Sequence, residues 1–179
     1  MAAVPAFLRR IAFLSVWLAT LAAGSPWVSP GAIAQSAVGD QPHRIVSLVP
    51  ATTEMLFAMG AGDRIAGVSN YDRFPPEVET LLKVGGLLDP NVELLIALKP
   101  DLVIVYDTQT DLKRQLASAA IPVFNYVHKG LPDITDTVRA LGARIGAEAA
   151  ARAEATRIEQ RLAAVRSRVA GLRRPKTLR

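Results

Sequence analysis

The sequence predicts an α/β fold, in which helices flank a central parallel sheet and a long helix follows. Short apolar runs alternate with amphipathic segments along the chain, which is the order of strands joined by helical crossovers. The run Leu102–Tyr106 is apolar on both faces, as is typical of a central parallel strand. The segment 148–171 has no proline and many helix-forming residues, so it predicts a helix roughly 35 Å long at about 1.5 Å per residue.

Each strand and helix is predicted from a local pattern. Strands are predicted at 44–49, 64–69, 102–106 and 121–126. Helices are predicted where apolar residues recur at helical spacing, at 52–59, 77–82, 92–99, 110–120, 131–145 and 148–171. The helix at 92–99 has clear boundaries, because Asn91 can cap its first turn and Pro100 cannot continue it.

The chain begins with a predicted signal peptide, residues 1–34. Arg9 and Arg10 supply a positive start, an apolar run of 13 residues follows at 11–23, and a small-x-small cleavage site ends at Ala34. The apolar run is shorter than the roughly 20 residues of a membrane span. The chain has no cysteine for a disulfide or a lipid anchor. We therefore expect cleavage after Ala34 and a free protein in the periplasm.

The rest of the chain is predicted to form one lobe and one connecting helix. Its expected parts are a flexible lead-in at 35–43, an N-terminal α/β lobe at 44–146, a long connecting helix at 147–172 and the start of a truncated second lobe at 173–179. Pro175 prevents the helix from resuming, and the residues after it resemble a strand begun and not finished. A natural C-terminal tail is the alternative.

Charge is unevenly distributed along the chain. Residues 35–142 carry 9 basic and 13 acidic side chains, a net charge of −4, whereas residues 143–179 carry 10 basic and 3 acidic, a net charge of +7. A basic segment raises nucleic acid as a partner. Export favours a solvated helix face instead, so no nucleic-acid partner is expected.

Three segments carry a family resemblance. They are R-I-V-S-L-V-P-A-T-T-E at 44–54, G-V-S-N-Y-D-R-F-P-P at 67–76 and V-G-G-L-L-D-P-N-V-E-L-L-I-A-L-K-P-D-L-V-I-V-Y at 84–106. Together they resemble the periplasmic substrate-binding proteins of ABC importers for cobalamin, haem and iron-siderophores, with the closest similarity to the cobalamin-binding member. The resemblance covers residues 44–179. It implies two Rossmann-like α/β lobes joined by a long rigid helix, with the second lobe absent here.

The resemblance also implies a function and a site. The protein would bind a corrinoid (cobalamin), or alternatively haem or a ferric siderophore, and deliver it to a membrane permease, without catalysis and without a cofactor. With half of the cleft expected to be missing, this chain would bind weakly at best. Tyr71 matches a ligand-stacking tyrosine, Tyr106 an aromatic residue facing the cleft, and Leu87 stands where the cobalamin binder has tryptophan. Tyr126 is grouped with them because it ends the fourth strand, and Glu93 matches a glutamate that docks onto the permease.

Each of these residues also has a purely structural interpretation. The two tyrosines 71 and 106 could simply pack against loops, and Glu93 could be held by the helix dipole. His43 and His128 are too few for a metal site, which usually takes three or four protein ligands. Asp72, Asp107 and Asp111 lie near the loops and are expected to be caps or solvated polar groups.

Two other classes of protein stay open on the sequence alone. An α/β enzyme with a nucleotide cofactor would need a glycine-rich turn after the first strand, but residues 49–51 are Val-Pro-Ala. An interaction protein could pair its long helix through the apolar face at 158–172 with another chain. Both are alternatives to the receptor.

Overall fold

The apolar run Leu102–Tyr106 forms β3, a central strand of a four-stranded parallel sheet. In the computed structural model, which describes residues 41–173, the strand order is β2-β1-β3-β4. The other strands are β1 (Ile45–Ser47), β2 (Ile65–Val68) and β4 (Val123–Tyr126). The predicted parallel sheet is therefore confirmed. The predicted signal peptide at 1–34, residues 35–40 of the lead-in and residues 174–179 lie outside the described residues.

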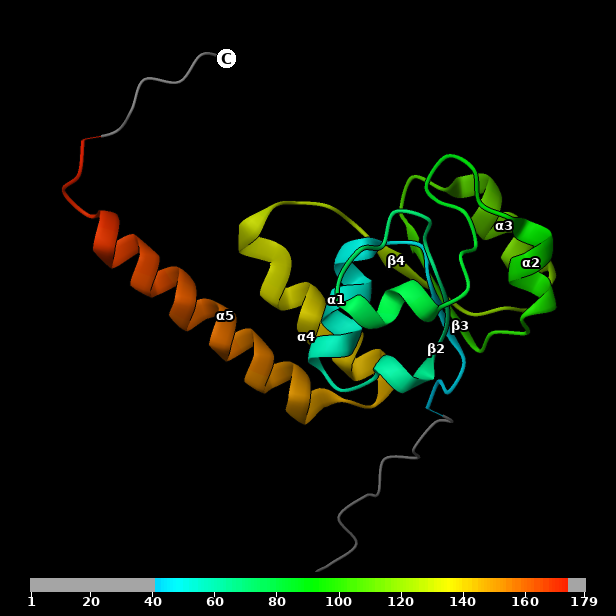
Figure 1. The fold of residues 1–179 in the computed structure, drawn as a ribbon, viewed down its shortest axis with the longest axis horizontal. Coiled ribbons are helices and arrows are strands. Elements are labelled where there is room, and N and C mark those ends of the chain that lie inside the picture. Colours follow the sequence, from blue (N-terminus) through cyan, green and yellow to red (C-terminus); the bar gives the residue numbers. More distant parts are fainter. Residues whose placement is uncertain (1–40, 174–179) are drawn as a thin grey trace, which may run out of the picture. The chain divides into compact units, whose positions relative to one another are not determined.

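Helices cover both faces of this sheet, because successive residues of a strand point to opposite sides. On one face, Ile104 packs with residues of α1 and α4. On the other, Val103 and Val105 pack with residues of α2 and α3. Figure 1 shows α1 and α4 on one side of the strands and α2 and α3 on the other. The ends of the four parallel strands are therefore left free to carry loops.

The helices agree with the predicted segments, with two corrections. The α-helices are α1 (Pro50–Ala58), α2 (Val92–Ala97), α3 (Thr110–Ser118), α4 (Ile134–Ile145) and α5 (Glu148–Val169). The predicted helix at 77–82 is instead a 3-10 helix, η2 (Pro76–Thr80), in which only Val78 is buried. A single buried side chain gives this segment too little apolar surface to hold a longer α-helix. The predicted helix at 131–145 likewise opens with a 3-10 turn, η3 (Leu131–Asp133). The remaining short helix is η1 (Gly62–Arg64).

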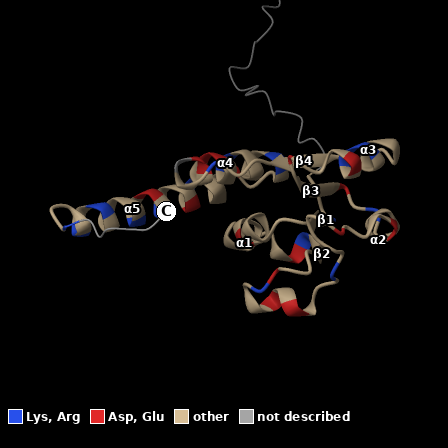
Figure 2. Ribbon diagram, turned by 90° about the horizontal axis from the view of Figure 1, so that it is seen from above, with Lys and Arg blue, Asp and Glu red and all other residues tan. Residues whose placement is uncertain are grey.

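The helix α5 packs on α4 only through its first part. A Cβ atom on Gly142 would lie 2.2 Å from the Cβ of Ala151, so glycine allows the two helices to touch. Ala151 and Ala155 are buried, whereas Val169 in the last turn is 53% exposed. Figure 2 shows basic residues along α5. None of the helices in the described part of the chain is long and apolar enough to cross a membrane.

The N-terminus of α2 provides a test of the predicted cap. The side-chain oxygen of Asn91 accepts a hydrogen bond from the backbone N–H of Leu94 at 3.0 Å. Asn91→Ala is expected to lower the free energy of unfolding by about 1 kcal/mol, because this N–H loses its partner. Urea denaturation would measure the loss, and Asn91→Asp, which keeps an acceptor, should retain most of the stability. Equal losses in both variants would contradict the assignment of the cap.

Candidate functional site

The carboxyl ends of the four parallel strands meet at one edge of the sheet, which we call the loop edge. In open α/β sheets, ligands bind in the crevice outside this edge. Tyr106 and Tyr126 are the last residues of β3 and β4 and are paired in the register of the two strands. Their rings meet edge to face, with centroids 5.8 Å apart and an interplanar angle of 76°. The structure therefore brings these two predicted site residues into contact.

Tyr71 follows β2 at the same edge, and its ring lies against Gly86. The side chain is 64% exposed. A Cβ atom on Gly86 would lie 2.5 Å from the ring, so only glycine leaves room for this contact. The N–H of Asn70 donates to the carbonyl of Gly85 at 2.8 Å, and the Gly85 N–H donates to the Asn70 side chain at 3.1 Å. The loop after β2 is thus fixed to the loop at 85–90.

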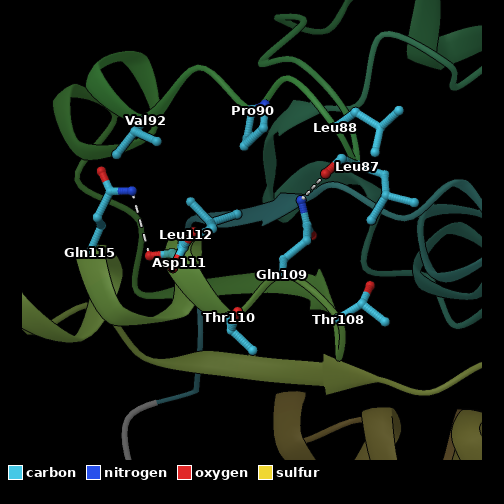
Figure 3. A pocket seen from close by; sticks show the side chains of 10 residues that line it. All are labelled: Leu87, Leu88, Pro90, Val92, Thr108, Gln109, Thr110, Asp111, Leu112 and Gln115. Carbon is cyan, nitrogen blue, oxygen red and sulfur yellow. Dashed lines mark hydrogen bonds between the residues drawn. The ribbon is translucent and has the colours of Figure 1, made fainter.

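Leu87 lies in that second loop, beside a small pocket. Leu87 and Leu88 are both exposed and belong to the pocket lining, together with Gln109 and the first turn of α3. Figure 3 shows the two leucines extending from the loop and Gln109 reaching toward it from below. The pocket volume is about 270 Å³. This is below the roughly 300–1,000 Å³ of ordinary small-molecule pockets, so a macrocycle would have to lie on the open edge.

Gln109 is a residue of this site that the sequence analysis did not identify. Its side chain is 7% exposed and its amide makes three hydrogen bonds. It accepts from the N–H of Tyr106 and donates to the carbonyls of Gly86 and Leu87. A glutamine just before a helix carries no sequence signal for such a role, because its partners in the loop lie 22 and 23 residues away.

Asp72 departs from its expected role as a cap or solvated group. Its side chain is 0% exposed, and no donor among the described residues reaches either carboxylate oxygen with hydrogen-bond geometry. Lys83 lies nearby, but its ammonium donates to the backbone carbonyls of Val78 and Asp72 rather than to the carboxylate. Burial raises the pKa of Asp72. The polar groups of Thr53 and Ser69, which lie close to the carboxylate without meeting hydrogen-bond geometry, and the positive charge of Lys83 act to lower it.

Burial also raises the pKa of the Tyr106 hydroxyl, and Tyr126 and Asp72 add to the effect. Next to this pair, the Tyr126 hydroxyl and Nδ1 of the exposed His128 are 3.1 Å apart and form a hydrogen bond. Within residues 41–173, no three His, Cys, Asp or Glu side chains gather closely enough to hold a metal ion. The loop edge is thus mainly aromatic and apolar, with a few polar groups at its base.

Glu93 lies in α2, the helix that directly follows the loop at 85–90. It occupies the first turn of α2, as predicted from the Asn91 cap, and its side chain is exposed. A carboxylate in this turn is favoured by the helix dipole, so its position alone does not require a partner. Its exposure nevertheless leaves the charge available to one.

Comparisons with known proteins give consistent matches. A model of a family described as periplasmic binding protein matches residues 45–178. An uncharacterized ABC transporter substrate-binding lipoprotein of Bacillus subtilis is 36% identical over 113 residues, which are 60% of this chain and 36% of the relative. A vitamin B12-binding protein of Pectobacterium carotovorum is 38% identical over 103 residues, which are 56% of this chain and 37% of the relative.

A solved structure is similar to this chain in both fold and sequence. The periplasmic heme-binding protein from Roseiflexus sp. RS-1 aligns with a TM-score of 0.69 and 26% identity, covering 74% of this chain and 52% of that protein. The chain therefore spans between about a third and about a half of the length of these proteins.

Proposed function

Because the chain belongs to the periplasmic binding protein family, we propose that it is the substrate-binding component of an ABC importer. It would bind a corrinoid or an iron chelate outside the cytoplasm. The observation that carries the proposal is the aromatic loop edge, where Tyr71 is exposed and Tyr106 packs on Tyr126. Aromatic side chains cover flat ligands at a low cost in conformational entropy, since each has only two side-chain torsions.

Cobalamin is the ligand that we propose first, with haem and ferric siderophores as alternatives. The vitamin B12-binding relative supports cobalamin, and the heme-binding structure supports haem. Both ligands are large and flat, in keeping with a site that is an open aromatic edge rather than a closed pocket. Delivery to a membrane permease is supported by the Bacillus relative, an ABC transporter substrate-binding lipoprotein.

Titration of the purified protein with cyanocobalamin, hemin and a ferric siderophore would test the proposal. Nuclear magnetic resonance suits this test, because it detects weak as well as tight binding and locates the residues affected. Chemical-shift changes should concentrate on the amides of the loops after β2, β3 and β4 and at 85–90. No shift with any of the three ligands, or shifts confined to α5, would contradict the proposal. A response to a nucleotide instead would favour the enzyme alternative.

Glu93 is proposed to dock onto an arginine of the permease. Exposed carboxylates on a receptor can orient it through charge-assisted hydrogen bonds. Glu93→Gln is expected to leave ligand titrations unchanged and to slow uptake by about tenfold, the effect of losing one bond to a charged group worth roughly 1.5 kcal/mol. Uptake of labelled ligand by cells producing each variant would measure this.

A matched control is Glu77→Gln, which removes another exposed carboxylate near a helix start. Uptake should be unaffected by this variant. Equal losses in the two variants would indicate a general effect of net charge, and an unchanged rate with Glu93→Gln would remove the docking role.

A further inference from the structure

We propose that Gln109 is a positioning residue for ligand binding, which fixes the loop at 85–90 against the end of β3 and so sets the spacing between Leu87, Tyr71 and Tyr106. The inference rests on the proposed function, because the three spaced side chains are the proposed ligand contacts. It adds a residue that makes no contact with ligand itself and that selects which ligand shapes fit the loop edge.

The hydrogen bonds of the amide define its orientation. Oε1 accepts from the N–H of Tyr106 at 3.0 Å, and Nε2 donates to the carbonyls of Gly86 at 3.3 Å and Leu87 at 3.0 Å. Both hydrogens of the amide and one lone pair are therefore in use. A flipped amide would place an oxygen against two carbonyl oxygens, so the side chain has one favourable orientation.

These bonds connect the three proposed contacts through the backbone. Gln109 binds Tyr106 through the backbone N–H of Tyr106, and it binds Leu87 through the backbone carbonyl of Leu87. The third partner is the carbonyl of Gly86, and the ring of Tyr71 lies against this glycine. Movement of the loop would therefore shift Leu87 and Tyr71 together, relative to Tyr106.

The position of Gln109 in the chain distinguishes positioning of the loop at 85–90 from capping of α3. It is the residue before α3, where a side chain ordinarily caps the helix. No hydrogen bond runs from its side chain to the first turn of α3. The amide points to the loop instead, as Figure 3 shows. Changing the amide should therefore release the loop without unravelling α3.

Gln109→Glu is the sharpest test, because it keeps the size of the side chain and replaces the donating nitrogen with an acceptor. Two hydrogen bonds to the loop are lost and oxygen faces oxygen. We expect amide hydrogen exchange at Asn70 and Gly85, whose N–H groups are hydrogen-bonded between the two loops, to accelerate at least tenfold, while exchange in β3 and α3 stays as in the wild type. Gln115→Glu is the matched control, since Gln115 is exposed on α3 and lines the same pocket. It should leave the loop unchanged.

Titration with cyanocobalamin and hemin supplies the second readout. Gln109→Glu should weaken binding about tenfold. If Gln109 acts by placing Tyr71, the effect of Tyr71→Ala should be smaller in the Gln109→Glu background than in the wild type, because the ring is already displaced. Acidification should restore part of the loop protection, since a protonated carboxyl can donate one hydrogen bond.

The two readouts keep this inference distinct from the proposed function. Unchanged loop exchange in Gln109→Glu would overturn the inference, whatever the wild type binds. Faster exchange across the whole core would also overturn it, because Gln109 would then stabilise the fold in general. Accelerated loop exchange with additive effects on affinity would reject the link to Tyr71. Failure of the wild type to bind either probe would instead count against the proposed function.

Discussion

Asp72→Asn is expected to raise the free energy of unfolding at neutral pH by on the order of 1 kcal/mol, because the amide lacks the charge that the buried carboxylate must carry above its raised pKa. The wild-type carboxylate is fully buried and, within residues 41–173, neither oxygen accepts a hydrogen bond. Asparagine has nearly the same shape and carries no charge, so the cost of burying a charge disappears. Denaturation in urea over a range of pH would measure the difference.

The raised pKa of Asp72 also predicts how the free energy of unfolding of the wild type changes with pH. Burial raises the pKa of Asp72 above its ordinary value of 3.8, so the folded protein holds this proton to a higher pH than the unfolded chain does. Between 3.8 and the raised pKa, the folded state binds more protons, and wild-type stability therefore falls as pH rises. Below 3.8 both states are protonated and this penalty is absent.

The stability advantage of Asp72→Asn should therefore be small in acid, grow through that window and become constant above it. Asp63→Asn, which changes an exposed carboxylate, is the control and should show no comparable gain. An advantage that is independent of pH would show that the charge of Asp72 is not its cause. A loss of stability at neutral pH would show that the Asp72 carboxylate has a stabilising partner.

Tyr71→Ala is expected to weaken binding of the proposed ligand about 30-fold, or about 2 kcal/mol, the effect of removing a central aromatic anchor. Tyr71 presents more free surface than Tyr106, whose ring packs on Tyr126. Its place is fixed by contact with Gly86, so little entropy is lost when a ligand stacks on it. Calorimetric titration with cyanocobalamin and hemin would measure the loss.

Two variants test whether the aromatic ring of Tyr71 and its contact with Gly86 account for the binding. Tyr71→Phe keeps the ring and should bind within a few-fold of the wild type. Gly86→Ala should displace the ring, because the added Cβ would lie 2.5 Å from it, and should reproduce much of the loss. Binding by Tyr71→Ala within twofold of the wild type would remove Tyr71 from the site.

The order of the elements could be predicted because their signals are local. β3 is evident from its apolar run, and α2 from Asn91 and the leucines that follow it. Pro76 predicts the start of the helix at η2 but not its type, because a segment of five residues is too short for apolar spacing to distinguish a 3-10 helix from an α-helix. Predictions of secondary structure thus succeeded where a pattern extended over a whole element.

The site could be predicted only in part. Tyr106 and Tyr126 end neighbouring strands, so the topology alone brings them together. The partners of Gln109 are distant in sequence, and nothing near the glutamine indicates them. Asp72 stands among polar residues that predict exposure, whereas its burial depends on packing against separate parts of the chain. The roles of Tyr71, Leu87 and Glu93 stay predictions until binding and uptake are measured.

The positions of the tyrosines give the protein a built-in optical probe. The chain has three tyrosines, and all of them lie at the loop edge. Its two tryptophans, Trp17 and Trp27, lie outside the described residues, in the predicted signal peptide. In a chain processed after Ala34, all ultraviolet emission from tyrosine would come from the proposed site. Corrinoids and haem absorb strongly, so quenching of this emission would report their arrival without any added label.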